Sequence, residues 1–279
     1  MKLSIITINR NNAEGLEKTL RSVAAQSFRE FEYIVIDGAS TDGSVEVIKK
    51  YEAQFAHLKW VSEPDRGIYN AMNKGLRMAT GDYIQILNSG DCLASNDILE
   101  RMLAALEEAG NPSILYGNMV KCFPDGRKMV DKCFAGQEIT MLDMYTGTLN
   151  HDPAYIRRDL FEKYGYYDES LKIVSDWKWY MQAIILGDEK PQYVDLDVTL
   201  FDMTGISENA DSKEMIRKER ETVLKQLIPN VYLIDYIRFS EDIHMMQRIH
   251  RYPFAYRLVW FLERCLFKLE KWKKKPCNL

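Results

Sequence analysis

Short apolar runs alternate with helical patterns of apolar residues along the first third of the chain. The runs are rich in β-branched and aromatic residues and stop at polar ones, which is typical of buried strands. They cover residues 3–8, 31–36, 58–61 and 83–87. Between them, apolar residues recur at helical spacing over residues 13–26, 40–51 and 68–79. This alternation predicts an α/β fold, a parallel sheet with helices on both faces.

The pattern is less regular over residues 95–205. Two strand-like runs, residues 115–120 and 127–133, flank Phe123-Pro124-Asp125-Gly126, which is a strong hairpin signal. The other expected elements are a helix over 98–109, a helical turn over 160–164, a helix over 176–186 and a strand over 192–201. Because nothing in this region resembles a linker, we expect it to complete the same sheet.

The composition shifts near the C-terminal end. Residues 243–279 carry nine basic and two acidic residues, interleaved with aromatic and aliphatic ones. This pattern predicts an amphipathic helix, and we expect a first domain over residues 1–225 and a helical, basic-aromatic extension over 226–279. Two interpretations stay open: the helix lies on an anionic membrane surface, or it packs on the core and ends in a solvated tail.

Composition excludes several classes of protein. The 279 residues are 46% hydrophobic and 28% charged, as in ordinary globular proteins, and the net charge of −4 argues against a nucleic-acid binder. The five cysteines form no C-x-x-C pair, so the sequence indicates neither a zinc site nor a disulfide framework. With no signal-peptide pattern and no apolar run of membrane-spanning length, we expect a cytoplasmic protein, with peripheral attachment to the inner face of the plasma membrane as an open alternative.

Polar and acidic residues follow each of the first four predicted strands. In a parallel sheet these exits share one edge, where ligands of open α/β sheets bind. That edge carries Asp37, suited to hydrogen bonds with a base, Arg66, suited to phosphate, and Asp91, suited to a metal ion. The alternative is that these are ordinary turn residues. A dinucleotide site is disfavoured because no G-x-G-x-x-G follows the first strand.

Five ordered motifs resemble family 2 glycosyltransferases, especially the bacterial branch that builds O-antigen, capsule and exopolysaccharide. They are SIITINRN at residues 4–11, VIDGASTDGS at 35–44, EPDRGIYNAMNKG at 63–75, ATGDYI at 79–84 and LNSGD at 87–91. The resemblance covers roughly residues 3–210. It implies a GT-A fold, that is, a Rossmann-like, mixed but mainly parallel sheet flanked by helices. It also implies an inverting mechanism, a nucleotide-sugar donor that is most often a UDP-sugar, and a Mg²⁺ or Mn²⁺ ion.

The resemblance also assigns residues on the donor side. Thr7 and Asn9 would line the nucleotide pocket, Asp37 would accept from uracil, and Arg66 would lie near the base or diphosphate. The tip Asn88-Ser89-Gly90-Asp91 stands at the place of the family's D-x-D motif. This chain departs from the usual pattern by keeping only the last carboxylate. Asp91 is then the expected metal ligand, with Asn88 and Ser89 beside the donor.

On the acceptor side, the resemblance assigns the catalytic base to Asp176. The alternative is that this carboxylate only stabilises the start of a helix, with Ser175 as its cap. His151 and Asp152 resemble the family's histidine position before an acceptor-side strand. Trp177 is a candidate to stack on a sugar face, although a core position is equally open. Residues 205–207 resemble a loop that closes over the donor.

The function predicted from the sequence is sugar transfer from a nucleotide-sugar donor to a saccharide or lipid-linked acceptor in cell-surface polysaccharide synthesis. The alternative is a nucleotide-sugar-binding, membrane-associated assembly protein in which the reduced acidic tip has weakened or abolished transfer. The two hypotheses differ in whether a bound donor is turned over.

Overall fold

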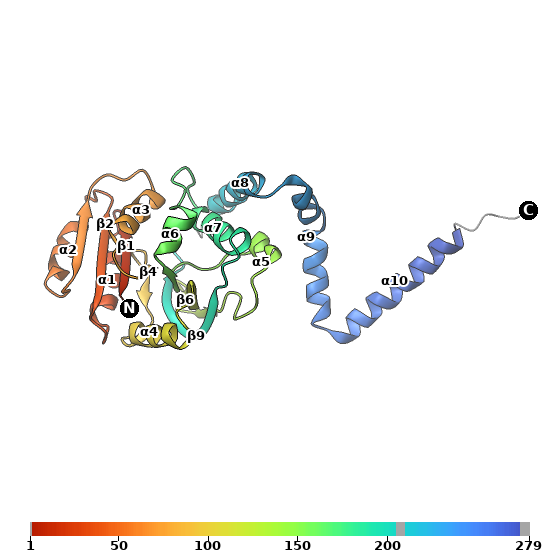
Figure 1. Cartoon of the computed structure of the whole chain (residues 1–279), viewed down its shortest axis with the longest axis horizontal. Helices are drawn as coiled ribbons and strands as arrows, with labels where there is room; N and C mark the ends of the chain where they lie inside the picture. Colours follow the sequence, from red (N-terminus) through yellow and green to blue (C-terminus); the bar gives the residue numbers. More distant parts are fainter. Residues whose placement is uncertain (1, 205–209, 274–279) are drawn as a thin grey trace, which may run out of the picture. The chain divides into compact units, whose positions relative to one another are not determined.

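A nine-stranded sheet organises the first of two units into which the chain divides, residues 1–227 and 228–279 (Figure 1). The structure is a computed structural model that describes residues 2–204 and 210–273. The strands are β1 Leu3–Asn9, β2 Phe31–Asp37, β3 Leu58–Ser62, β4 Tyr83–Ile86, β5 Cys92–Leu93, β6 Ile114–Cys122, β7 Lys128–Asp131, β8 Ala154–Arg157 and β9 Gln192–Asp202. Their order is β3-β2-β1-β4-β8-β6-β9-β5, and β7 pairs with β6.

The helices of the first unit connect these strands. They are α1 Ala13–Ala24, α2 Ser44–Glu52, α3 Ile68–Met78, α4 Ile98–Glu108, α5 Met141–Thr146, α6 Asp159–Tyr164, α7 Ser175–Tyr180, the π-helix η1 Met181–Leu186, and α8 Ala210–Leu227. The single helix predicted over 176–186 is therefore two successive helices of different pitch. The predicted α/β architecture, with a mixed sheet flanked by helices, is confirmed.

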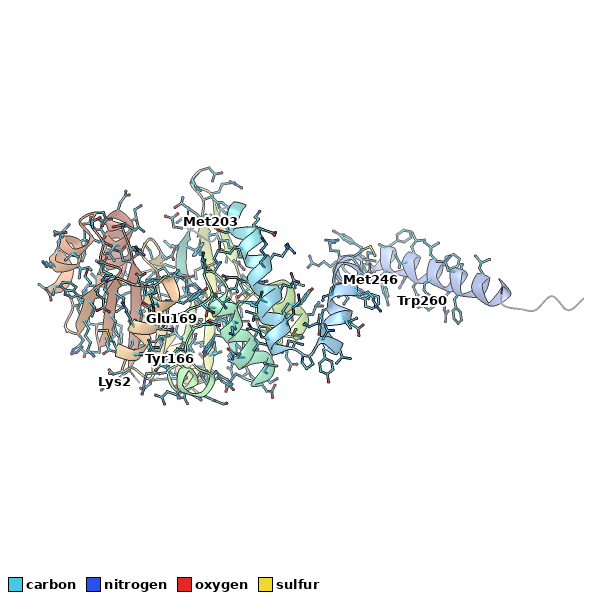
Figure 2. All side chains as sticks on the ribbon, turned by 90° about the horizontal axis from the view of Figure 1, so that it is seen from above. Lys2, Tyr166, Glu169, Met203, Met246 and Trp260 are labelled. Atoms are coloured by element: carbon cyan, nitrogen blue, oxygen red, sulfur yellow. The ribbon has the colours of Figure 1, made fainter. Side chains whose placement is uncertain are left out.

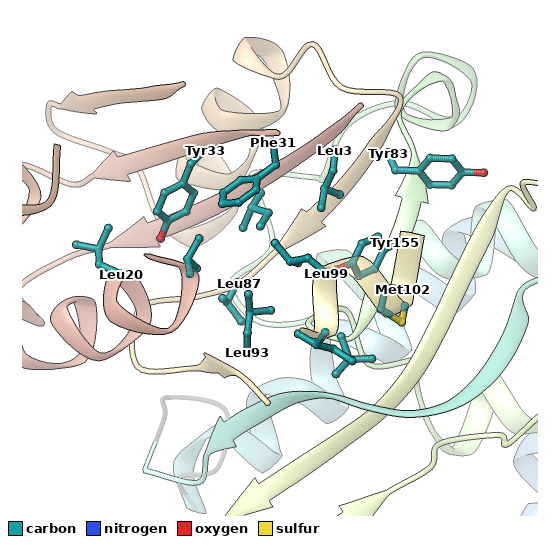
Figure 3. Packing of buried hydrophobic residues seen from close by; sticks show 14 of the residues in the cluster. Leu3, Leu20, Phe31, Tyr33, Tyr83, Leu87, Leu93, Leu99, Met102 and Tyr155 are labelled. Atoms are coloured by element: carbon teal, nitrogen blue, oxygen red, sulfur yellow. The ribbon is translucent and has the colours of Figure 1, made fainter. Parts of the chain in front are cut away.

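Strands β1 to β4 form the predicted parallel half of the sheet. β2 and β4 pair with β1 on its two sides, and β3 pairs with β2, all in parallel. Every residue of β1 is buried, because helices cover both faces of this central strand. On one face Leu3 and Ile5 join a cluster with side chains of α1, α2 and α4 (Figure 3). On the other face α3 approaches so closely that a Cβ on Gly75 would lie 2.4 Å from the Ile6 side chain.

The second half of the sheet is built from residues 92–202, as expected. β8 runs antiparallel to β4 and β6, and β9 runs parallel to β6. The predicted hairpin is present, since β6 and β7 pair in the register Cys122↔Lys128. The short elements β5 and α5 were not predicted, because two and six residues are too few to show a hydrophobic period.

The described part of the second unit, residues 228–273, consists of two long helices, α9 Asn230–His250 and α10 Pro253–Lys273. Pro229 immediately precedes α9 and Pro253 is the first residue of α10, positions where a missing backbone N–H costs nothing. Many apolar side chains of these helices are exposed, among them Trp260 at 50% (Figure 2). Among the described residues, no helix has the length and apolar character needed to cross a membrane.

Candidate active site

The tip that follows β4 is held in shape by α1. The Thr19 hydroxyl donates to the Asp91 carbonyl at 2.7 Å and accepts from the Gly90 N–H at 2.9 Å. Gly90 has a φ of 110°, which an L side chain rarely adopts, so the glycine is required for this turn. Asp91 is only 5% exposed, and its Oδ1 accepts from the Asp202 N–H at 2.9 Å. Asp91 is thus held in a fixed, buried position at the predicted edge.

His151 and Asp152 meet this tip because β8 runs antiparallel to β4, which brings the start of β8 to the end of β4. Gln85 of β4 donates to the Asp152 carbonyl at 2.9 Å. The Asn88 Nδ2 and His151 Nε2 atoms lie 3.1 Å apart. Asp152 is 2% exposed, and its Oδ1 lies 3.5 Å from His151 Nε2. The two predicted acceptor-side residues therefore lie directly beside the predicted metal-side tip.

Asp176, the second residue of α7, joins the same cluster from the other side. Its Oδ2 lies 3.2 Å from His151 Nδ1, and its Oδ1 accepts from the Tyr69 hydroxyl at 2.9 Å. His151 consequently bridges Asn88 and Asp176 through its two ring nitrogens. Segments separated by about sixty and by twenty-five residues converge here.

The carboxylates and the imidazole of this cluster shift one another's pKa. Burial and the neighbouring Asp152 carboxylate raise the pKa of Asp91 well above its usual range. Burial alone would lower the pKa of His151, but Asp152 and Asp176 raise it to about 9. Burial opposes ionisation of Asp176, yet the hydrogen bond and charge of His151 hold its pKa below the usual range. The Asp176 carboxylate is therefore stabilised by the His151 ring that faces it.

The backbone before Asp176 is clamped from two sides. The Tyr69 hydroxyl donates to the Ile173 carbonyl, and the Glu219 carboxylate accepts from the N–H groups of residues 172–174 at 2.8 to 3.3 Å. Glu219 was not predicted, since nothing distinguishes it from the other charged residues of α8. The proposed cap is wrong: α7 begins at Ser175, which makes no cap bond and instead accepts from the Asp168 N–H.

Trp177 is not available to stack on a sugar in this structure. Its side chain is 1% exposed, and its Nε1 donates to the Met144 carbonyl at 2.7 Å. The Arg220 guanidinium covers the ring, 4.7 Å from its centroid. The core interpretation of Trp177 therefore holds, because the first turn of α7 points this residue inward.

The donor-side predictions have mixed outcomes at the ends of β1 and β2. Thr7 is fully buried, and its hydroxyl lies 3.0 Å from the Tyr33 hydroxyl inside the core, so it does not line a nucleotide pocket. Thr7 lies on the same face of β1 as Leu3 and Ile5, because successive side chains of a strand point to opposite faces of the sheet. Asn9 donates to Asp37 Oδ1 at 2.9 Å, while its own Oδ1 is buried without a hydrogen-bond partner among the described residues.

Asp37 is fully buried and already accepts several hydrogen bonds. Besides Asn9, these come from the Ser40 N–H and hydroxyl and from the Ser62 hydroxyl at 2.6 Å. A carboxylate has about four acceptor sites, so all are in use. Contact with uracil through Asp37 requires one serine to turn away, and this role stays a prediction.

Arg66 lies at the exit of β3, and its side chain is 79% exposed. Its guanidinium donates to Glu169 Oε2 at 2.7 Å, and Asn70 and Asn73 donate to the same carboxylate. The structure thus shows an Arg66–Glu169 ion pair, and a role near the base or diphosphate stays a prediction. Ser89 lies in the tip, where its carbonyl accepts from Asn12 Nδ2 at 3.1 Å. The loop expected over residues 205–207 falls outside the described residues.

The site offers oxygen atoms that are suited to a divalent cation, but the described residues form no metal site made of protein ligands alone. Within residues 2–204 and 210–273, no three or more His, Cys, Asp or Glu side chains form a group that could hold a metal ion. Asn88 Oδ1 and Asp152 Oδ1 are buried with no hydrogen-bond partner in the described part of the chain, and the Asp152 carboxylate interacts electrostatically with Asp91. Such orphaned acceptors fit a cation that shares its coordination with substrate oxygens and water.

Known relatives place the sequence in one family. The profile of Glycosyl transferase family 2 matches residues 4–165. An uncharacterized glycosyltransferase of Mycobacterium tuberculosis is 31% identical over 212 residues, which cover 75% of this chain and 78% of the relative. A PGL/p-HBAD biosynthesis glycosyltransferase of Mycobacterium bovis is 25% identical over 217 residues, 77% of this chain and 82% of that protein.

Solved structures share the fold. TarS of Staphylococcus aureus (residues 1–349, in complex with UDP-GlcNAc) matches with a TM-score of 0.63 and 23% identity, over 78% of this chain and 65% of that one. The mannosyltransferase PcManGT of Pyrobaculum calidifontis, in complex with GDP-Man and Mn²⁺, matches with a TM-score of 0.55 and 18% identity, over 71% and 56% of the two chains. With the family profile covering more than half of its length, the chain belongs to glycosyl transferase family 2 and is a glycosyltransferase with the GT-A fold.

Proposed function

We propose that this enzyme transfers a sugar, with inversion, from a UDP-sugar to a hydroxyl of a saccharide or lipid-linked saccharide in cell-surface polysaccharide synthesis. The observation that carries the proposal is the contact chain Asn88–His151–Asp176, which joins the tip after β4 to the start of α7. A uridine donor is supported by the UDP-GlcNAc complex of TarS, and the five sequence motifs support the polysaccharide branch.

A Mg²⁺ or Mn²⁺ ion would be held by Asp91 and Asn88 together with diphosphate oxygens of the donor. Hard oxygen ligands and several retained waters are what Mg²⁺ prefers, so one carboxylate and one amide suffice on the protein side. The ion would neutralise charge on the departing diphosphate. The presence of Mn²⁺ in the PcManGT complex supports the use of a divalent cation. A cation beside Asp91 and Asp152 would also relieve the repulsion between these two carboxylates.

Asp176 is the proposed general base. As the acceptor oxygen bonds to the anomeric carbon, its proton passes to Asp176 and the bond between that carbon and the diphosphate oxygen breaks. Tyr69 and His151 each hold one carboxylate oxygen, which fixes the orientation of the base and keeps it ionised at neutral pH. The His151 and Asp176 side chains are 18% and 17% exposed, so an acceptor hydroxyl could reach the base.

Replacing Asp176 tests the proposal. We expect Asp176→Asn to lower kcat by about 10² to 10⁴, the range for loss of a general base, while UDP affinity stays within about twofold. Transfer from radiolabelled UDP-sugars and calorimetric titration with UDP measure the two quantities. Asp159→Asn, an exposed carboxylate on α6, is the matched control. Wild-type protein that binds UDP-sugars without turnover would instead establish the assembly-protein alternative.

We further propose that residues 1–225 form the transferase domain and that the extension, residues 226–279, attaches peripherally to an anionic membrane. Arg257, Arg264 and Lys268 recur at spacings of seven and four, so they share one side of α10. Around the rest of the helix Phe254, Leu266 and other apolar side chains are exposed, at 81% and 62% for these two. Basic residues beside aromatic and aliphatic ones suit an interface of anionic head groups and acyl chains.

A further inference from the structure

Glu169 lies in the segment between α6 and α7 and ties this segment to α3. Its Oε2 accepts from the Arg66 guanidinium at 2.7 Å and from Asn70 Nδ2 at 2.8 Å. Its Oε1 accepts from Asn73 Nδ2 at 3.1 Å. Asn73 also exchanges two hydrogen bonds with the backbone of Tyr167, at 2.8 and 3.0 Å. The carboxylate is therefore held by α3, whereas the side chain of Arg66 is largely in solvent.

Stability alone does not account for the ion pair between Arg66 and Glu169. An ion pair with so exposed an arginine contributes only about 0–1 kcal/mol to folding. A free arginine side chain, in contrast, carries about 2 kcal/mol of rotamer entropy. Hydrogen bonds from Asn73, Arg66 and Asn70 hold the pKa of Glu169 below its usual range, so the carboxylate is charged at neutral pH. The main effect of this fixed charge is to restrict the guanidinium to one orientation.

The position of Arg66 indicates which ligand this orientation serves. Arg66 follows β3, whose last residue, Ser62, pairs with Asp37 at the edge where the donor is proposed to bind. The Arg66 N–H donates to Asn70 Oδ1 at 3.1 Å, so the backbone of the arginine is fixed as well. The ion pair engages Nη2, and a guanidinium has five N–H donors, so donors remain for a phosphate.

We infer that Glu169 is a positioning residue, which holds the Arg66 guanidinium in place for the diphosphate of the nucleotide-sugar donor. Guanidinium and phosphate are matched in charge and in hydrogen-bonding geometry, provided that the planar group is correctly oriented. Glu169 itself does not contact the donor in this arrangement. Its effect on donor binding passes through Arg66, and this dependence can be measured.

This inference rests on the proposed function, and a double-mutant cycle tests it separately. The probe is UDP with Mn²⁺, and calorimetry gives its Kd for the wild type, Glu169→Gln, Arg66→Gln and the double variant. Glu169→Asp keeps the charge on a shorter side chain and is a second, milder variant. Glu162→Gln, which removes an exposed glutamate that pairs with Arg158, is the matched control.

We expect Arg66→Gln to weaken UDP binding roughly tenfold, the usual effect of losing a charged hydrogen bond, and Glu169→Gln to weaken it roughly three- to tenfold. The double variant should bind UDP as Arg66→Gln does, because Glu169 acts through an arginine that is no longer there. Glu169→Asp should lie between the wild type and Glu169→Gln, and Glu162→Gln should equal the wild type. Thermal unfolding checks that each variant is folded, and Glu169→Asp replaces Glu169→Gln in the cycle if the latter is not.

Several outcomes overturn the inference. If the two single losses add up in the double variant, Glu169 supports the fold in general and not Arg66 in particular. Unchanged UDP affinity in either single variant would show that Arg66 does not meet the donor or needs no positioning. Tighter binding by Glu169→Gln would show that the ion pair competes with the donor. Failure of the proposed function has a different signature, because the wild type would then not bind UDP at all.

Discussion

Buried acceptor atoms without partners mark the ligand side of the site at the scale of single residues. Among the residues that the structure describes, nine buried side-chain polar atoms lack a partner, and three of them, on Asn9, Asn88 and Asp152, are oxygens at strand ends on one edge of the sheet. Leaving a buried acceptor unpaired costs roughly 1–3 kcal/mol, so a native protein retains such atoms where a ligand or water completes them. We expect donor, cation or water to complete the three oxygens at this edge.

Asp168 gives a prediction for the pH dependence of stability. Its carboxylate accepts from Lys178 Nζ at 2.6 Å, and this hydrogen bond, with that of Ser170, overcomes the opposing effect of burial and lowers the pKa of Asp168 to about 2. The stabilisation is thus fully present above the unfolded-state pKa near 4 and is lost as pH falls toward 2. We expect Asp168→Asn to lower the free energy of unfolding by about 1–2 kcal/mol at pH 7, after allowance for partial exposure.

Urea unfolding at pH 7, 4 and 2.5 measures this effect. The difference between wild type and Asp168→Asn should shrink as the pH decreases from 4 to 2.5. Asp188→Asn, a carboxylate with an 82% exposed side chain, is the control and should follow the wild type at each pH. A difference that is constant across the series would contradict the role given to ionisation of Asp168.

At the scale of elements, α8 positions the segment that leads into α7. Glu219 receives three backbone N–H groups of the segment just before α7, which would otherwise lack a partner in secondary structure. We expect Glu219→Ala to lower the free energy of unfolding by about 1–3 kcal/mol and to lower kcat by at least about tenfold at unchanged UDP affinity. A role limited to stability would leave kcat unchanged below the melting temperature. Glu221→Ala, exposed on the same helix, is the control for steady-state kinetics and thermal unfolding.

The second element-scale prediction concerns α10 and vesicles. We expect the full chain to sediment with vesicles that contain phosphatidylglycerol and not with pure phosphatidylcholine vesicles. Each basic residue near an anionic surface contributes about 1 kcal/mol, so reversing Arg264 and Lys268 to Glu should lower the partition coefficient by more than about tenfold. The control reverses Arg217 and Lys218, two exposed basic residues of α8. Equal binding by both double variants would show that α10 is not the attachment site.

At the scale of the whole molecule, ligand binding should stabilise the first unit. A ligand at a hundred times its Kd adds about 2.7 kcal/mol, which corresponds to several degrees in Tm for a unit of this size. We expect UDP with Mn²⁺ to raise Tm, UDP with EDTA to raise it less, and Asp91→Asn to remove the difference between the two. GDP and CMP serve as base controls in the same thermal-shift series. A metal-independent shift of full size would exclude Asp91 as the metal ligand.

The order of strands and helices in the parallel half, and the residue types at the strand exits, could be predicted from the amino-acid pattern alone. Hydrophobic period is a local property, so it shows where β1, α1 and β2 lie and that Asp37 and Asp91 follow strands. Side chains alternate between the two faces of β1, so Thr7 lies on the same face as the buried Leu3 and Ile5. The motif around Asp176 pointed to the same residue that the fold brings to His151.

Which side chains contact one another could not be predicted from the amino-acid pattern and became visible in the folded chain. The contacts of His151 with Asn88 and Asp176, of Glu219 with residues 172–174, and of Arg220 with Trp177 join segments that are 25 to 63 residues apart. Such contacts depend on strand pairing and helix docking, which no local pattern records. The same packing surrounded Asp37 with serine hydroxyls and buried Trp177, because the space around a side chain is set by elements distant in the chain.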